Sequence, residues 1–416
     1  GDAGVPKSAD DRMTFLSKAD IERKRVHYRS HAPQGRVCTV SVMDDTDPDI
    51  EFDEDGVCNH VHYARRRLAK ERLRGPETVA RLEQAVDRIK REGKGKAYDC
   101  VLGVSGGVDS TYAAWRAKEL GLRPLAVHLD NGWNSDLAVS NIERVLSVLG
   151  IDLYTYVVDW EEIKDLQRSV ILSGTANLEV VTDHAINATM VRQAARHGIR
   201  TIVTGVNVET ESMHLGKWHY DNRDAYFIRG LHKRFGSVKL KTYPTISAFD
   251  LAWYLFVRRI RTLPVLNYAE YNKEKVSKLL QDELGWQPYA HKHGESIYTR
   301  FFQERYLPQK WGFDKRKLHF STLIVSGQMT RDEALKKLEE PLYEAREEEE
   351  ELEYVTKKLG FDPTEWSRVM SGERKYFFDY PNRAWMFDYN NPLVQYVRAV
   401  GKGERRILGL SPRHQS

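Results

Sequence analysis

The sequence predicts an α/β protein whose centre is a doubly wound, Rossmann-like parallel sheet. Between about residues 98 and 240, short apolar runs alternate with segments of helical spacing. Three of these helical segments end at or next to a glycine (Gly121, Gly150 and Gly198), a residue that commonly closes a helix. Strands joined through helices run parallel and are buried on both faces, so helices are expected on both sides of the sheet.

The apolar runs and the helical segments between them fix the expected order of elements. Ligands in such sheets bind beyond the carboxyl ends of the strands, so the loops after Val104, Leu129, Val158 and Thr204 are the expected site of chemistry. Strands are expected at 98–104, 124–129, 153–158 and 201–204, and helices at 110–120, 135–149 and 182–197.

Length and composition predict several domains in a water-soluble protein. A chain of 416 residues with 41% hydrophobic residues is too long for one ordinary core. We expect a polar leader (1–35), a small module with a following helix (36–97), the sheet domain (98–245) and a mostly helical C-terminal domain (246–416). The first 20 residues have no apolar core typical of a signal peptide, and no run of 18 apolar residues predicts a membrane span.

Charge and cysteine content narrow the class of protein. The net charge is +4, from 64 basic and 60 acidic residues, which gives no general case for nucleic-acid binding. Three cysteines cannot form a disulfide framework, so a cytoplasmic location is expected. The acidic stretch 344–353 is expected to be a solvated helix face.

The loop Ser105–Ser110, with the sequence SGGVDS, carries the strongest chemical signal. It follows an apolar strand and opens a helix, so the backbone N–H groups at Gly106, Gly107 and Val108 can form an anion nest at the positive end of the helix. Ser105 and Ser110 add hydroxyl groups, and Asp109 suits Mg²⁺. A Walker A loop is excluded because Gly-Lys-Ser/Thr is missing. The alternative is a glycine-rich turn with an aspartate cap.

This loop resembles the SGGxDS loop of the ATP pyrophosphatases, or adenine nucleotide α-hydrolase group. Further strings between about residues 36 and 370 are together similar to the N-acetyl sugar amidotransferase family. They lie at 127–133, 182–186, 204–207, 228–236, 239–244, 266–268, 292–296, 299–301 and 326–331.

The resemblance implies ATP, Mg²⁺ and a two-step reaction. ATP would be cut between its α and β phosphates, and AMP would be placed on the oxygen of a sugar acetamido group. Ammonia from a separate HisH-like glutaminase would then displace AMP and form an amidine in the synthesis of a surface polysaccharide such as lipopolysaccharide. The acceptor would be a nucleotide-linked sugar or a similar small amide.

Other polar residues at expected strand ends are candidates for the same site. Asp130 and Asn131 are expected to hold the nucleotide, and Gly205 and Asn207 to line its crevice. Lys233 and Lys241 are candidate catalytic cations for the departing pyrophosphate, beside Arg234 and Lys239, with a plain surface position as the alternative. The candidate substrate contacts are Asp183, His184, Glu211 and Lys217, although an Asp cap with a structural His is an equal interpretation of the first two.

The N-terminal module departs from the family pattern. Relatives carry two Cys-x-x-Cys pairs that would bind Zn²⁺, whereas here Ser41 and Val61 follow Cys38 and Cys58. A Cys2His2 site using His60 and His62 would need unusual loop geometry, and the alternative is a module held by packing alone.

The same scarcity of thiols bears on the reaction. Cys100 lies inside an expected strand, and Val325 stands where relatives have cysteine, so a sulfur carrier is hard to find. Ammonia is therefore the preferred nucleophile. The competing functions are thiolation of tRNA or of a small molecule, amidine formation on an acceptor that is not a sugar, and a binding module that has lost catalysis.

Overall fold

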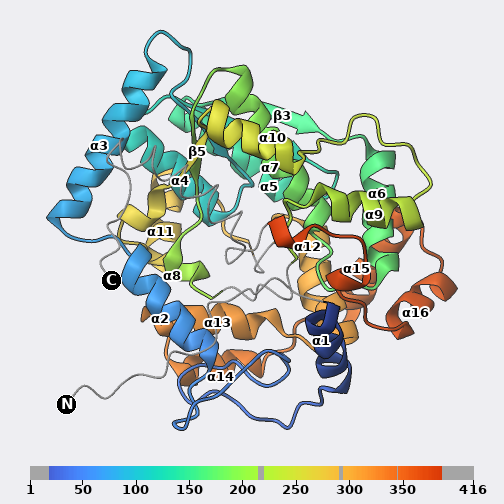
Figure 1. Ribbon diagram of the computed structural model, residues 1–416. Helices are drawn as coiled ribbons and strands as arrows, with labels where there is room; N and C mark the ends of the chain where they lie inside the picture. The colour runs from blue at the N-terminus through green and yellow to red at the C-terminus, as the bar shows by residue number, and fades with distance from the viewer. Residues whose placement is uncertain (1–17, 214–219, 290–293, 344, 387–416) are drawn as a thin grey trace.

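The computed structural model describes residues 18–213, 220–289, 294–343 and 345–386 (Figure 1). At its centre is one parallel sheet of five strands in the order β3-β2-β1-β4-β5. The α/β doubly wound class is thereby confirmed. The strands are β1 (Cys100–Gly103), β2 (Pro124–Asp130), β3 (Asp152–Val157), β4 (Thr201–Thr204) and β5 (Arg261–Pro264).

Helices cover both faces of the sheet because neighbouring strand residues point to opposite sides. Leu102 packs with α4 (Val108–Glu119) and α5 (Asp136–Leu149) in one core cluster. Its neighbour Val101 packs with α7 (Val180–Arg196) in another. All four expected strands and all three expected helices of this block are therefore found.

The sheet does not end where the sequence suggested. Strand β5 pairs with β4, with Ile202 opposite Thr262 in the register. This strand comes from the segment after residue 245, which was expected to be mostly helical, so the sheet crosses the expected domain boundary.

The described helices before the sheet, and those between and after its strands, complete the fold. Two of them, α6 and α9, pack against each other, and α6 follows the edge strand β3 in the chain. The helices not yet introduced are α1 (Lys18–Ser30), α2 (Asn59–Glu71), α3 (Pro76–Gly93), α6 (Trp160–Ser173), α8 (Val208–Glu211), α9 (Ala225–Phe235), α10 (Ala248–Ala252), α11 (Lys273–Leu284), α12 (Ile297–Phe301), α13 (Lys315–Ser326), α14 (Arg331–Leu338), α15 (Ala345–Leu359) and α16 (Pro363–Ser371), with π-helical turns at Trp253–Val257 and Phe302–Trp311 and 3₁₀ turns at Val265–Tyr268, Phe377–Asp379 and Ala384–Met386.

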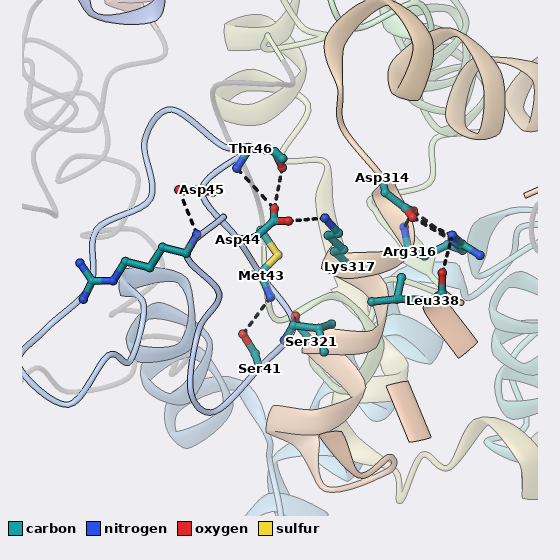
Figure 2. A network of polar contacts seen from close by, with 12 residues as sticks. Ser41, Met43, Asp44, Asp45, Thr46, Asp314, Arg316, Lys317, Ser321 and Leu338 are labelled. Atoms are coloured by element: carbon teal, nitrogen blue, oxygen red, sulfur yellow. Dashed lines mark hydrogen bonds and ion pairs between the residues drawn. The ribbon is translucent and has the colours of Figure 1, made fainter. Parts of the chain in front are cut away.

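The N-terminal module is docked on the C-terminal helices. Figure 2 shows Asp44 of the module paired with Lys317 of α13. The backbone N–H of Val42 donates to the Ser321 hydroxyl at 3.2 Å, and the Arg331 guanidinium donates to the carbonyl of Ser41 at 3.1 Å. The module is thus fixed by polar contacts to α13 and α14.

The acidic stretch is only partly a solvated face. In α15, Glu347 and Glu351 lie 2.7 Å and 3.5 Å from the guanidinium of Arg300, which belongs to α12. One side of the acidic helix is therefore an ion-paired packing surface, which corrects the expectation. Across the described ranges, we find no helix with the length and apolar character that a membrane crossing requires.

Candidate active site

The loop Ser105–Ser110 joins β1 to α4 in a conformation that needs glycine. Gly106 has φ +82°, and a Cβ there would lie 2.9 Å from the carbonyl oxygen of Ala138. The Gly106 carbonyl accepts hydrogen bonds from the Trp286 indole at 2.8 Å and from the Tyr289 hydroxyl at 3.0 Å. Two aromatic residues that follow α11 therefore fix the loop.

The two serines of the loop lie close together at the first turn of α4. Ser110 Oγ accepts from the Ser105 N–H at 3.2 Å, donates to the Gly107 carbonyl at 3.1 Å and lies 3.1 Å from Ser105 Oγ. Two hydroxyls at the positive end of a 12-residue helix are suited to bind an anion such as pyrophosphate.

The loop lies where the strand order reverses. The chain runs from β1 to β2 and β3 on one side, then returns to β4 on the other side of β1. A Cβ on Gly205, which follows β4, would lie 2.7 Å from the Asp109 carbonyl oxygen. Asn207 Nδ2 donates to Asp109 Oδ1 at 3.3 Å. The predicted residues Gly205 and Asn207 are thus brought to the loop, in the crevice where such sheets bind ligands.

Asp109 has a second partner that the sequence did not reveal. The hydroxyl of Tyr271, which lies after β5, donates to the same Oδ1 atom. Burial and the Asp109 carboxylate raise the pKa of Tyr271 far above its usual value, so the phenol stays protonated as a donor. The carboxylate is therefore held in place from β4 and from the segment after β5.

The polar groups at the end of β2 bond within the protein. Asp130 Oδ1 accepts from the Gly132 N–H at 2.8 Å. Asn131 is buried, and its amide donates to the hydroxyl of Thr182 on α7 at 3.2 Å while its oxygen accepts from the Trp133 N–H at 3.3 Å. Asn131 therefore ties β2 to α7, and its expected contact with nucleotide stays a prediction.

Glu295 lies next to the loop, although the sequence did not single it out within the string 292–296. Its Oε1 would lie 3.7 Å from a Cβ placed on Gly107. The Glu295 carbonyl accepts from the Ser135 N–H at 3.1 Å, which holds this segment against the loop after β2. A second carboxylate thus stands next to the anion-binding loop.

Four ionisable residues form what we call the charged cluster: Glu179, Asp183, Glu211 and Lys315. Lys315, in the first turn of α13, interacts electrostatically with all three carboxylates, and burial lowers its pKa. Burial and the nearby Glu179 raise the pKa of Asp183 to about 7. Thr299 Oγ1 donates to Glu179 at 2.6 Å. The cluster joins the predicted residues Asp183 and Glu211 to two residues that the sequence did not single out.

His184 is enclosed by the protein. It is completely buried, its Nε2 accepts from the Ile246 N–H at 3.0 Å, and its Nδ1 lies 2.6 Å from the Asn222 carbonyl. Burial lowers its pKa, so the ring is neutral and donates through Nδ1. This geometry fits the structural interpretation of His184 and leaves no ring nitrogen for a substrate. Lys217 lies outside the described residues.

Lys233 and Lys241 are exposed beside the edge of the sheet. Tyr156, in β3, donates to the Thr242 carbonyl at 2.6 Å, which places this segment at the edge strand and two strands away from β1. The N–H of Lys241 donates to Glu162 at 2.9 Å, so its backbone is fixed while its side chain is solvated. A role for either ammonium group at pyrophosphate stays a prediction.

The cysteine module does not assemble a zinc site. Cys38 Sγ accepts from the N–H groups of Ser41 at 3.4 Å and of Cys58 at 3.3 Å, and all three side chains are buried. His60 pairs with Asp47 and His62 with Asp53, which corrects the Cys2His2 alternative. Two sulfurs without further ligands do not fit Zn²⁺. No group of three possible metal ligands occurs within the ranges that the structure covers.

Comparison with known families identifies the C-terminal part. Residues 295–391 match the family model described as "LPS biosynthesis protein WbpG-like, C-terminal domain". The chain is similar to this domain over that range. The range contains Glu295, at the loop, and Lys315, in the charged cluster. The resemblance expected from the sequence strings is thereby confirmed for this part of the chain, and no curated protein is detectably similar in sequence.

Several solved structures are similar at low identity. An NMN synthetase from Francisella tularensis is 14% identical over 54% of this chain and 92% of its own, with a TM-score of 0.25. An NH3-dependent NAD synthetase from Campylobacter jejuni is 15% identical over 50% and 96%, with a TM-score of 0.25. A 4-thiouridine synthetase in complex with RNA and ATP is 17% identical over 45% and 50%, with a TM-score of 0.24. At these scores the fold assignment depends on the sheet itself.

Proposed function

We propose that this protein is an ATP-dependent amidotransferase that adenylates an amide oxygen, releases pyrophosphate and lets ammonia displace AMP. The observation that carries the proposal is the Ser105–Ser110 loop at the point where the strand order reverses, with Asp109 held by Asn207 and Tyr271. Backbone N–H groups, two hydroxyls and a helix N-terminus together suit a pyrophosphate group.

The loop also fits the metal that ATP brings. Mg²⁺ commonly uses one or two protein carboxylates together with phosphate oxygens, and Asp109 and Glu295 both stand at the loop. When bound, the ion would neutralise charge on the departing pyrophosphate. The protein's own part is to position Asp109 through the hydrogen bonds from Asn207 and Tyr271, and to hold the Glu295 backbone through Ser135.

The C-terminal domain supports the proposed kind of acceptor. The matched family model is described as an LPS biosynthesis protein. This favours the acetamido group of a nucleotide-linked N-acetyl sugar as the amide that reacts. Adenylation makes the amide oxygen a good leaving group, and attack by ammonia then gives an amidine. The chain contains no cysteine available as a glutaminase nucleophile, so the proposal includes a separate HisH-like glutaminase as the partner that supplies ammonia.

The buried thiols favour ammonia over sulfur. Cys38, Cys58 and Cys100 are the only cysteines in the sequence, and all three are buried without disulfides. Burial raises the pKa of Cys100, which makes its thiol inert. A thiolation enzyme that carries sulfur on its own cysteine would need an accessible thiol.

Two assays test the proposed function. Exchange of labelled pyrophosphate into ATP should depend on a nucleotide-linked N-acetyl sugar, and release of AMP should then depend on ammonium. Sulfide-dependent product, or co-purified tRNA that becomes thiolated, would favour the thiolation alternative. Failure with every N-acetyl sugar while another amide reacts would exclude the sugar as acceptor.

A further inference from the structure

A cavity opens between the N-terminus of α9, the N-terminus of α10 and the segment after α16. It has a volume of about 340 Å³, counted with its open mouth, and three of its lining side chains are arginines: Arg223, Arg229 and Arg383. This volume lies at the lower end of the range of small-molecule sites, about 300–1,000 Å³. The cavity, which we call the arginine pocket, shares no lining residue with the Ser105–Ser110 loop or with the charged cluster.

The arginine pocket adjoins the N-terminal half of α7. The residues that precede Arg223 and Ser247 of its lining both contact His184 on that helix. The carbonyl oxygen of Asn222 lies 2.6 Å from His184 Nδ1. The N–H of Ile246 donates to His184 Nε2 at 3.0 Å. The buried imidazole therefore joins two walls of the pocket to α7.

This half of α7 lies at the carboxyl edge of the sheet. The helix leads into the start of β4 and contacts β1, β2 and β4, so its N-terminus points to the opposite edge, where the strands end. The amide of Asn131, after β2, donates to the hydroxyl of Thr182 in its first turn at 3.2 Å. The arginine pocket and the Ser105–Ser110 loop are thus on the side of the sheet where ligands bind.

The guanidinium groups of the pocket are oriented, but only one is seen paired with an acid. Arg223 donates through Nε to Asp221 Oδ1 at 2.8 Å. The guanidinium of Arg383 lies over the Tyr226 ring, 4.9 Å from its centroid, and this cation–π contact fixes its position. Among the residues that the structure describes, Arg229 and Arg383 form no ion pair with an acidic side chain.

The carboxylates beside the pocket are already used by helix caps. Asp224, which lines the pocket, is buried and accepts from two N–H groups in the first turn of α9 at 3.0 Å and 3.2 Å and from the N–H of Arg383 at 2.6 Å. Asp250 accepts from the N–H and the hydroxyl of Ser247 at 2.9 Å and 2.7 Å in the capping box of α10. The positive charge of the pocket is therefore available to a ligand.

We propose that the arginine pocket binds the diphosphate group of a nucleotide-linked sugar and so holds the acceptor at the carboxyl edge of the sheet. This inference rests on the proposed function and deepens it, because it names the group by which the acceptor is recognised. Guanidinium groups match phosphate oxygens with paired hydrogen bonds. A diphosphate has negative charge on two adjacent phosphates, which suits arginines that come from α9 and from the segment after α16.

The two phosphate-bearing substrates would then have separate sites. The Ser105–Ser110 loop has hydroxyls, a helix N-terminus and the Asp109 carboxylate, which suit the phosphates of ATP with their Mg²⁺. The arginine pocket has guanidinium groups, which bind phosphate without a metal ion. ATP and the nucleotide-linked sugar can therefore be bound together, as adenylation of the acceptor requires.

Calorimetric titration of the full-length protein tests the pocket directly. The protein is first saturated with Mg²⁺ and the α,β-methylene analogue of ATP, which occupy the loop, and is then titrated with UDP, CDP, GDP and dTDP in turn. We expect at least one of the four to bind, and its Kd to rise at least about tenfold in Arg229→Met and in Arg383→Met. The matched control is Arg196→Met, which removes an exposed arginine from the last turn of α7 and should bind as wild type does.

A kinetic test separates binding from chemistry. In sugar-dependent exchange of pyrophosphate into ATP, Arg229→Met should raise KM for the nucleotide-linked sugar at least about tenfold. The rate at saturation should stay within about threefold of wild type, because the pocket holds a part of the acceptor that does not react. KM for ATP should not change. Arg229→Lys keeps the charge but loses the planar guanidinium, so its KM should lie between those of wild type and Arg229→Met.

Several results would overturn the inference. One is that none of the four nucleoside diphosphates binds the wild type, and another is that both variants bind them as tightly as wild type does. Binding of glucuronate that depends on Arg229, without binding of a nucleoside diphosphate, would make the ligand a sugar carboxylate instead.

The controls keep these outcomes distinct. If Arg383→Met does not fold, as judged by circular dichroism, Arg229→Met decides, since Arg229 is exposed and donates no hydrogen bond to any described residue. If no N-acetyl sugar supports exchange, the proposed function fails, whereas titration with the nucleoside diphosphates still tests the pocket. If exchange depends on the sugar but its KM is the same in Arg229→Met, the pocket assignment alone fails.

Discussion

Helices α6 and α7 both carry carboxylates beside the sheet. Their two environments shift the carboxyl pKa in opposite directions. On α6, Glu162 accepts from the N–H groups of Lys241, Thr242 and Tyr243 at 2.7–3.0 Å. Burial alone would raise the pKa of Glu162, but these donors outweigh it and lower the pKa. On α7, burial and Glu179 prevail and raise the pKa of Asp183.

The difference shows that N–H donors decide the direction in which the pKa of a carboxylate on these helices shifts. Asp165 follows the pattern of Glu162, because it accepts from Ser237, Val238 and His232, and its pKa is also lowered. A carboxylate supplied with several N–H donors remains ionised and holds its partner segment. A carboxylate with fewer donors is left with the opposing effects of burial and like charge, which raise the pKa of Asp183 to about 7.

The largest expected effect concerns a third carboxylate, Asp109, whose proposed role is to hold the Mg²⁺ that accompanies the phosphates of ATP. Asp109→Asn should lower exchange of pyrophosphate into ATP by about 1,000-fold, about 4 kcal/mol in barrier height, because a neutral amide holds Mg²⁺ poorly. Asp87→Asn, an exposed Asp on α3, should leave exchange unchanged. Exchange at the wild-type rate in Asp109→Asn would show that the metal is held elsewhere.

The nucleotide loop could be predicted because its chemistry is local. Ser105–Ser110 contains the glycines, hydroxyls and carboxylate in six consecutive residues, and alternating strands and helices placed Gly205 and Asn207 at the same edge. Tyr271 and Lys315 could not be found in this way, since only the packing of the segment after β5 and of α13 brings Tyr271 to Asp109 and Lys315 to the charged cluster. Strand β5 is as short as β1 and β4, but its sequence Arg-Thr-Leu-Pro is not the apolar run that predicted those two strands.

The next largest effect is expected for Glu162→Gln, on the free energy of unfolding. Glu162→Gln places an amide NH2 among backbone N–H donors, so we expect a loss of about 2–3 kcal/mol in the free energy of unfolding. Exchange of pyrophosphate measured well below the melting temperature should change less than about threefold, because Glu162 holds a segment and does not contact the loop. The matched control is Glu161→Gln, whose side chain is 66% exposed and which should unfold as wild type does. Loss of exchange with unchanged stability would contradict the structural role.

The change of stability with pH should be a smaller effect. It should have opposite signs for the carboxylates of α6 and α7. The lowered pKa of Glu162 adds stability above its unfolded pKa, and this is lost as pH falls through the folded pKa, below about 4. The raised pKa of Asp183 acts in reverse: stability falls as pH rises from about 4 to about 7. Asp183→Asn should therefore gain roughly 2–4 °C over wild type between pH 5 and pH 8. Calorimetry checks this, and no gain would mean that Asp183 is ionised throughout.

The smallest expected effect concerns the lysines beside the α6 carboxylates. Lys241 contributes its backbone N–H to Glu162, and its exposed ammonium lies at the edge of the sheet away from β1. Lys241→Ala and Lys233→Ala should each keep exchange of pyrophosphate within about twofold, since an exposed cation in water contributes little. A loss above about tenfold would instead show that the segment moves toward the loop when ATP binds. In that case the Glu162 hydrogen bonds would have to break or travel with it, so Glu162→Gln would also lose exchange, and the role of Glu162 would no longer be purely structural.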